Sequence, residues 1–170
     1  MECLKKILKY LILVVILISF GMSNLYAKKY LLNGYYNPNR IIFKLSNRVF
    51  ECSLMGVTVP YYNNTSKCNR QKSLAHMSNP SIGFFQNHLN LEQLYDVEII
   101  DGYCIVKYNN INFNEKIIMS GYGIVNVKSI NNQTLLDRFL YLENLAIENK
   151  MGLWNHFYDE MQCLRDISIG

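Results

Sequence analysis

The run ECSLMGVTVPYYNN, Glu51–Asn64, decides the fold, because apolar and β-branched residues fill its first half and Gly56 and Pro60 punctuate it. With the residues before it, the run extends a strand-like segment, Arg48–Val59. The segment RIIFKL, Arg40–Leu45, has a similar composition, and Ser46-Asn47 between the two supplies a turn. This pattern predicts a β-hairpin that opens the domain.

The middle of the chain changes character twice. Residues 60–80, PYYNNTSKCNRQKSLAHMSNP, contain many turn formers and little periodicity, which predicts a long surface loop. From Ser81 the spacing of phenylalanine and leucine predicts a helix. Two short strands, DVEIID and YCIVKY, are then expected before a turn at Asn109-Asn110.

The last third adds helices to the strands. NFNEKIIMSG, Asn112–Gly121, predicts a short helix that Gly121 ends, and YGIVNVKSI predicts a further strand. Apolar residues at helical spacing predict an amphipathic helix from near Asn132 to before Gly152. The order of elements predicts an α+β fold whose strands can close into a small barrel.

The first residues do not belong to this fold. Lysines precede the apolar run LILVVILISF, and small or neutral residues follow it, which is typical of a secretory signal peptide spanning residues 1–27. The run is about half the roughly 20 residues that span a bilayer, so an uncleaved anchor is the weaker interpretation. We expect a periplasmic or secreted protein, with a domain at residues 28–154 and a C-terminal extension at residues 155–170.

Four cysteines follow the predicted signal peptide: Cys52, Cys68, Cys104 and Cys163. An even number in an exported chain indicates disulfides, and all three pairings stay open at this point. The chain has no CxxC pair and its histidines are scattered, so a zinc site is not expected.

Three stretches carry a resemblance to a known family. They are SLMGVTVP (Ser53–Pro60), NEKIIMSGYG (Asn114–Gly123) and LENLAIENKMGLW (Leu142–Trp154), and in this order they resemble the staphylococcal nuclease (thermonuclease-like) family. With their flanks they cover about Tyr36 to Trp154. The resemblance implies a five-stranded OB-fold barrel with packed helices, and an activity that cleaves DNA and RNA with calcium.

The resemblance also implies where the family's charged groups should stand, and this chain lacks them there. Asn37 and Asn39 match the first calcium-binding aspartate stretch, and Thr58 matches the second calcium-binding aspartate. Ser53 and Asp101 match the two catalytic arginines, and Tyr61 matches the glutamate usually cast as general base. An amide oxygen binds calcium more weakly than a carboxylate does, so we expect neither a catalytic residue nor a metal or other cofactor.

A relocated carboxylate is the weaker interpretation of Glu51. It lies two residues before Ser53 and therefore on the same face of a strand. A single carboxylate makes a poor calcium site, and a solvent-facing strand residue is the stronger interpretation.

Positive charge gathers in the first part of the expected domain. Eight basic residues fall between Lys28 and Lys72 against the single acid Glu51, and such a field can attract a polyanion, although a solvated face is at least as good an interpretation. Tyrosines beside these cations can pack in a barrel or stack on bases. The candidate nucleic-acid-binding residues are Arg40, Lys44, Arg48, Tyr61, Tyr62, Lys67, Arg70 and Lys72.

The sequence therefore supports three hypotheses. The first is an exported nuclease-type barrel that has lost its catalytic residues and binds a partner, nucleic acid being one such partner. The second is a calcium-dependent extracellular or periplasmic endonuclease, the only case in which calcium is expected. The third is a protein-interaction module of the cell envelope, and membrane contact is expected only through an uncleaved anchor.

Overall fold

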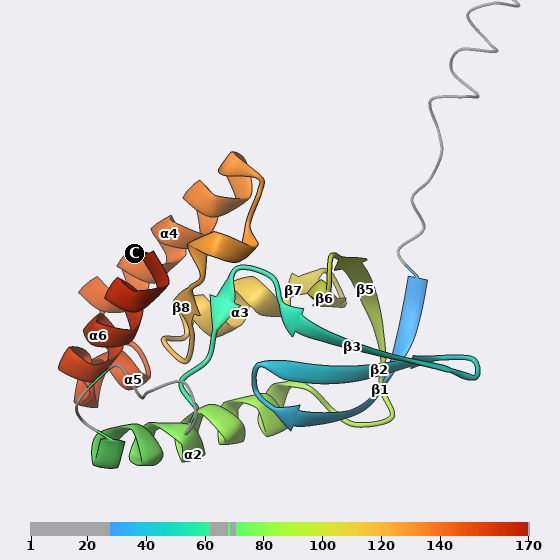
Figure 1. The fold of residues 1–170 in the computed structure, drawn as a ribbon, viewed down its shortest axis with the longest axis horizontal. Coiled ribbons are helices and arrows are strands. Elements are labelled where there is room, and N and C mark those ends of the chain that lie inside the picture. The colour runs from blue at the N-terminus through green and yellow to red at the C-terminus, as the bar shows by residue number, and fades with distance from the viewer. Residues whose placement is uncertain (1–27, 62–67, 69–70, 170) are drawn as a thin grey trace, which may run out of the picture.

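The computed structural model describes residues 28–61, 68 and 71–169, with the side chains of residues 71–75 left aside (Figure 1). The predicted signal peptide, residues 1–27, lies outside the described residues. The strands are β1 (Lys28–Asn37), β2 (Arg40–Leu45), β3 (Arg48–Leu54), β4 (Val57–Thr58), β5 (Leu94–Ile100), β6 (Tyr103–Tyr108), β7 (Ile111–Asn112) and β8 (Ile124–Val125). The helices are α2 (Gln71–His88), α3 (Phe113–Met119), the 3-10 turn η1 (Val127–Ser129), α4 (Gln133–Glu148), α5 (Leu153–His156) and α6 (Tyr158–Ile169).

Five strands close into a barrel. They run in the order β3-β2-β1-β5-β6 with antiparallel neighbours, and a parallel pairing of β3 with β6 closes the ring. Along β2, Ile41 and Phe43 are buried while Arg40 and Lys44 are exposed, which is the period of two that a barrel wall requires. The predicted hairpin of β2 and β3 and the α+β barrel are confirmed.

Strand β1 was not predicted, although it is the longest strand. It pairs with both β2 and β5, so it joins the two hairpins of the barrel. Its register shifts between Leu32 and Gly34 and again between Tyr35 and Asn37. These irregularities break the alternation of apolar and polar residues on which strand prediction depends.

The prediction of one long loop over residues 60–80 was wrong for residues 71–80, which are helical, while residues 62–67 and 69–70 lie outside the described residues. Helix α2 begins at Gln71 and continues through Pro80, which is exposed within the helix, to His88. The loop was expected because this stretch has many turn formers and little periodicity, and Pro80, a residue that usually interrupts a helix, stands at its end. Packing outweighs these local signals, since Met77 and Phe85 on α2 are fully buried, as is almost all of Leu89 directly after it.

Most of the remaining elements agree with their sequence signals. Asn109 and Asn110 both have positive φ in the turn between β6 and β7. The Asn112 side chain caps α3, and the Asn132 side chain caps α4. The prediction of a strand over YGIVNVKSI was wrong for most of its length. Only Ile124–Val125 forms a strand there, which pairs with β4, and the chain then turns through η1.

The segment Gly152-Leu153-Trp154 lies between α4 and α5 and contacts the residues that follow α3. Gly152 has a φ of 51°, and a Cβ added there would lie 2.4 Å from the Ser120 carbonyl oxygen. This close approach lets Leu153 donate its backbone N–H to the Gly121 carbonyl at 3.0 Å. Leu153 and Trp154 are thereby buried.

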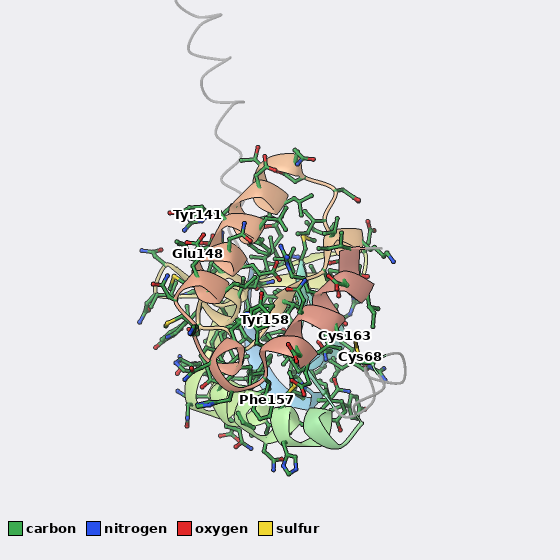
Figure 2. All side chains as sticks on the ribbon, turned by 90° about the vertical axis from the view of Figure 1, so that its left-hand side faces the viewer. Cys68, Tyr141, Glu148, Phe157, Tyr158 and Cys163 are labelled. Atoms are coloured by element: carbon green, nitrogen blue, oxygen red, sulfur yellow. A yellow bond between two sulfur atoms is a disulfide. The ribbon has the colours of Figure 1, made fainter. Side chains whose placement is uncertain are left out.

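Two apolar clusters form the core. The larger fills the barrel and reaches α4, and the smaller joins α2, β8, α4, α5 and α6 around Trp154. The C-terminal extension belongs to the smaller cluster through Met161 and Leu164, and a disulfide joins Cys163 on α6 to Cys68 (Figure 2). No helix among the described residues is long and apolar enough to cross a bilayer.

Candidate functional site

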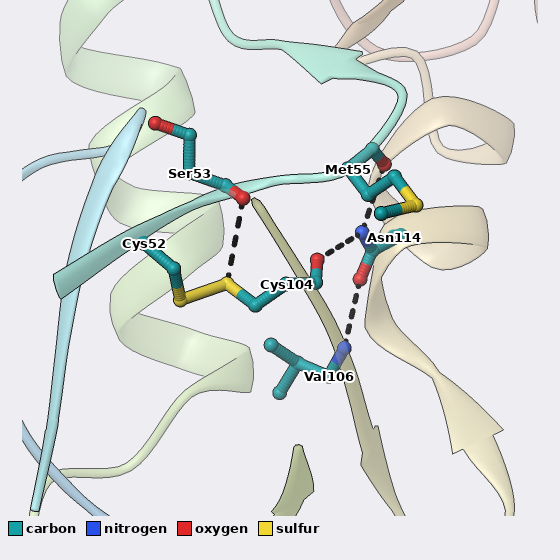
Figure 3. The surroundings of a disulfide bond; sticks show 6 residues. All are labelled: Cys52, Ser53, Met55, Cys104, Val106 and Asn114. Atoms are coloured by element: carbon teal, nitrogen blue, oxygen red, sulfur yellow. Dashed lines mark hydrogen bonds between the residues drawn. A yellow bond between two sulfur atoms is a disulfide. The ribbon is translucent and has the colours of Figure 1, made fainter. Parts of the chain in front are cut away.

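One end of the site expected from the family resemblance lies at the parallel pairing of β3 with β6, called the seam below. Ser53 pairs with Tyr103, and its backbone N–H donates to the Gly102 carbonyl at 3.0 Å. The disulfide Cys52–Cys104 crosses the same seam, with Cα atoms 5.7 Å apart (Figure 3). Ser53 therefore lies beside the turn between β5 and β6, where Asp101 stands.

Asn114 fastens this seam from α3, a role that the sequence did not reveal. Its buried Nδ2 donates to the carbonyls of Met55 and Cys104, each at 2.9 Å, and its Oδ1 accepts the Val106 N–H at 3.0 Å (Figure 3). One amide thus binds the backbone of β6 and of Met55, the residue directly after β3. The only sequence signal was the presence of Asn114 at the head of a family-like stretch.

Asp101 occupies a two-residue hairpin turn. Its φ is 50° and that of Gly102 is 80°, and Asp-Gly is a favoured pair for a turn with two positive φ values. The Asp101 side chain is exposed. A carboxylate thus stands in the turn where the resemblance places an arginine.

The other end of the site is the turn between β1 and β2. Asn37 Oδ1 accepts the backbone N–H of Asn39 at 2.9 Å. The Asn39 side chain forms a two-point clamp on Val59, accepting its N–H at 2.7 Å and donating to its carbonyl at 2.8 Å. Both asparagine oxygens, the candidate calcium ligands, therefore already accept backbone hydrogen bonds.

The fold brings the family-site positions together in two groups. The Asn39 clamp holds Asn37 and Asn39 against the segment of Thr58 and Tyr61, and the seam holds Ser53 against Asp101. Thr58 pairs with Ile124, and both Thr58 and Tyr61 are half-buried. Asp101 is the only charged residue at these positions. Within the described ranges, no group of three or more His, Cys, Asp or Glu side chains could hold a metal ion.

The outer face of β2 and β3 carries the described candidate cations. Arg40 forms an ion pair with Glu51 and lies over the ring of Tyr36, 5.5 Å from its centroid. Tyr36 is 68% exposed. Lys44 and Arg48 are exposed and form no ion pair with any other described residue.

Several of the candidate nucleic-acid-binding residues lie outside the part of the chain that the structure describes. Tyr62, Lys67 and Arg70 fall outside the described residues, as does the side chain of Lys72. Glu51, the candidate relocated carboxylate, is held by Arg40 and has no second described carboxylate grouped with it.

Two comparisons relate this chain to known proteins. A family model described as staphylococcal nuclease homologue matches residues 53–156. An uncharacterized protein of Methanocaldococcus jannaschii is 49% identical over 47 residues, which is 28% of this chain and 21% of that protein. The chain thus spans about a fifth of the length of the curated relative it matches.

Proposed function

This chain belongs to the staphylococcal nuclease family, and from that membership we propose that its barrel binds single-stranded nucleic acid without hydrolysing it. Membership supports a function related to nucleic acid or its cleavage. The observation that carries the non-hydrolytic half of the proposal is the clamp of Asn39 on Val59. It commits the amide at a family aspartate position to the backbone.

The chemistry of hydrolysis explains why this matters. Calcium prefers several oxygen ligands with carboxylates among them, and the described site positions offer amides, hydroxyls and one carboxylate. Ser53 and Asp101 replace the cations that would stabilise charge on the phosphoryl group in the transition state. Removing one preorganised group of this kind typically costs about 10²- to 10³-fold in rate, so the loss of several supports the absence of efficient cleavage.

The surface chemistry supports binding. OB-folds bind oligonucleotides on the face of their second and third strands and on the loops that join strands one to two and four to five. In this barrel that face is β2 and β3, with Lys44 and Arg48, and the first loop adjoins the Tyr36–Arg40 pair. A cation beside an exposed aromatic ring suits a single strand, whose bases stack while its phosphates are neutralised.

We also propose that the chain is exported. Disulfides form and persist in oxidising compartments, and the pairs Cys52–Cys104 and Cys68–Cys163 support a periplasmic or secreted location.

The test uses the full chain with a fluorescently labelled single-stranded DNA 20-mer. We expect the strand to stay intact in millimolar calcium. We also expect binding, followed by fluorescence anisotropy, that weakens as salt rises, because each neutralised phosphate of a single strand contributes a slope of about −0.7 to log K against log salt. Lys44→Gln or Arg48→Gln should each weaken binding and make that slope shallower by about 0.7. Lys150→Asn is the matched control, because it removes a charge after α4 at a residue with a φ of 50°, which asparagine tolerates.

Two results would contradict the proposal in different ways. Cleavage that a chelator abolishes and that Glu51→Gln removes would restore the endonuclease hypothesis. Binding that is absent or independent of salt would favour a protein partner in the cell envelope.

A further inference from the structure

A cavity of about 160 Å³ opens between the β5–β6 turn and η1 with the segment that follows it. Met55, Ile100 and Tyr103 give it an apolar and aromatic wall, and Asp101, Lys128 and Asn131 give it a polar rim. A volume this small suits one flat ring rather than a drug-sized ligand, for which cavities of roughly 300 Å³ or more are usual.

Two further lining residues already have structural partners. The Ser129 hydroxyl accepts the Gly56 N–H at 2.8 Å and donates to the Asn126 carbonyl at 3.0 Å. The Asn132 Oδ1 accepts the Leu135 N–H at 3.0 Å and so caps α4. These bonds fix one side of the cavity and leave the rim groups to meet a ligand.

Asp101 and Lys128 are the charged groups of the rim. Both are exposed, and they form no ion pair with each other although they line the same cavity. Asp101 forms no hydrogen bond with another described residue. A ligand that satisfies both must present hydrogen-bond donors at one end and negative charge at the other.

Among the bases, guanine fits these requirements. Its Watson–Crick edge carries two adjacent donors, N1–H and the N2 amino group, which match the two oxygens of a carboxylate. Adenine and cytosine place a ring acceptor beside their amino group, and thymine flanks its single N–H with carbonyls, so each would direct a lone pair at Asp101. Unstacked bases of single strands are commonly read at this edge and held against aromatic side chains.

We propose that this cavity binds a guanine base, with Asp101 accepting from N1–H and N2–H, Tyr103 contacting the ring and Lys128 meeting the adjacent phosphate. The inference rests on the proposed binding of nucleic acid and names the base that is selected. It also gives Asp101 a role that the family's arginine could not have, because an arginine offers donors only.

The test measures binding of the full chain to three labelled thymidine 10-mers that carry one central guanine, hypoxanthine or adenine. Hypoxanthine is guanine without the amino group. A bidentate contact typically discriminates by 1–3 kcal/mol, so we expect the guanine strand to bind roughly 5- to 150-fold more tightly than either of the others. Guanosine monophosphate carries the same base and phosphate, and its own affinity shows whether a free nucleotide or a strand is the preferred source.

Two variants separate base recognition from charge. Asp101→Asn keeps a residue that favours a positive φ, so the turn should persist, but its amide offers one acceptor and turns a donor toward the base. We expect the guanine strand to weaken until it binds within about twofold of the hypoxanthine and adenine strands, whose own affinities should not decrease. Glu98→Gln removes an equal charge from the exposed face of β5, outside the cavity, and should keep the preference.

The outcomes are distinct. Equal binding of all three strands, or a preference for guanine that survives Asp101→Asn, overturns the assignment of the cavity and leaves the proposed function standing. Failure to bind any strand overturns both proposals. Loss of the preference with Asp101→Asn alone supports the guanine site.

Discussion

Asn39 is the residue on which the proposed absence of cleavage depends most, because its side chain is bound at both ends to the Val59 backbone. We predict that Asn39→Asp, which places a carboxylate at that position, lowers the free energy of unfolding by about 1–3 kcal/mol, because the bond from Asn39 Nδ2 to the Val59 carbonyl is lost and a negative charge faces that carbonyl. Urea denaturation would measure the change. Asn37→Asp is the matched control, since its oxygen only accepts the Asn39 N–H and a carboxylate does the same.

Calcium gives the same experiment a second readout. A ligand that binds only the folded state raises stability in proportion to RT ln(1 + [L]/Kd). We therefore expect millimolar calcium to leave the unfolding midpoint of the natural chain unchanged. A clear rise with calcium would mean that the amide site holds the metal.

Tyr95 is the residue that should couple stability to alkaline pH. Burial raises the pKa of the Tyr95 hydroxyl above its usual value of about 10, although its bond with the Asn90 backbone opposes the shift. Between these two pKa values the folded chain binds more protons than the unfolded chain, so stability present below pH 10 falls as pH rises. Tyr95→Phe should flatten this decline, and Tyr36→Phe, which alters an exposed ring, should not.

The positions of the family site could be assigned from the sequence where a local motif marks them. The family-site positions Ser53, Thr58 and Tyr61 could be assigned because Gly56 and Pro60 mark the register of the strand, and the loss of the catalytic groups at these positions stays a prediction. The clamp of Asn39 and the hold of Asn114 on the seam could not be predicted, because both join residues far apart in the chain. Only the closed barrel brings their partners together.

The joint between β3, β6 and α3 is the element contact on which barrel closure depends. We predict that Asn114→Ala destabilises the chain by about 3 kcal/mol or more, because two carbonyls and one N–H lose their partners in a buried place. Asn33→Ala, at an exposed residue of β1, should change stability by less than about 0.5 kcal/mol. Similar losses for both variants would show that the seam does not depend on this amide.

Element prediction succeeded where local pattern and packing agreed. The alternating segments of β2 and β6 and the capped helices α3 and α4 were predicted close to their observed bounds. It failed for β1, whose irregular pairing hides the alternation, and for α2, where buried Met77 and Phe85 outweigh Pro80. The conformations of β1 and α2 depend on contacts between residues far apart in the chain. A short stretch of sequence around either element does not reveal these contacts.

For the molecule as a whole, the open question is whether the C-terminal extension is an addition to the barrel or a part of its fold. Arg165 on α6 donates to Glu143 on α4 at 2.8 Å, and the fully buried Glu143 also accepts the Val125 N–H of β8 at 2.8 Å. One carboxylate therefore joins the extension, the long helix and the small sheet. Together with Met161 and Leu164, this contact makes the extension part of the second core cluster.

The ion pair between Arg165 and Glu143 should stabilise the packing of the C-terminal extension on α4. Arg165→Met leaves a buried carboxylate without its cation, so we expect a loss of about 3–5 kcal/mol, whereas Arg138→Met, which breaks a more exposed pair with Glu115, should cost at most about 1 kcal/mol. Adding Glu143→Gln to Arg165→Met should recover most of the loss, because glutamine still accepts from Val125 and carries no charge. Denaturation followed by the fluorescence of Trp154, the only tryptophan of the chain and buried in the same cluster, measures all these variants. If the double variant were no more stable than Arg165→Met, the buried charge would not be the cause, and the extension would depend on packing and its disulfide alone.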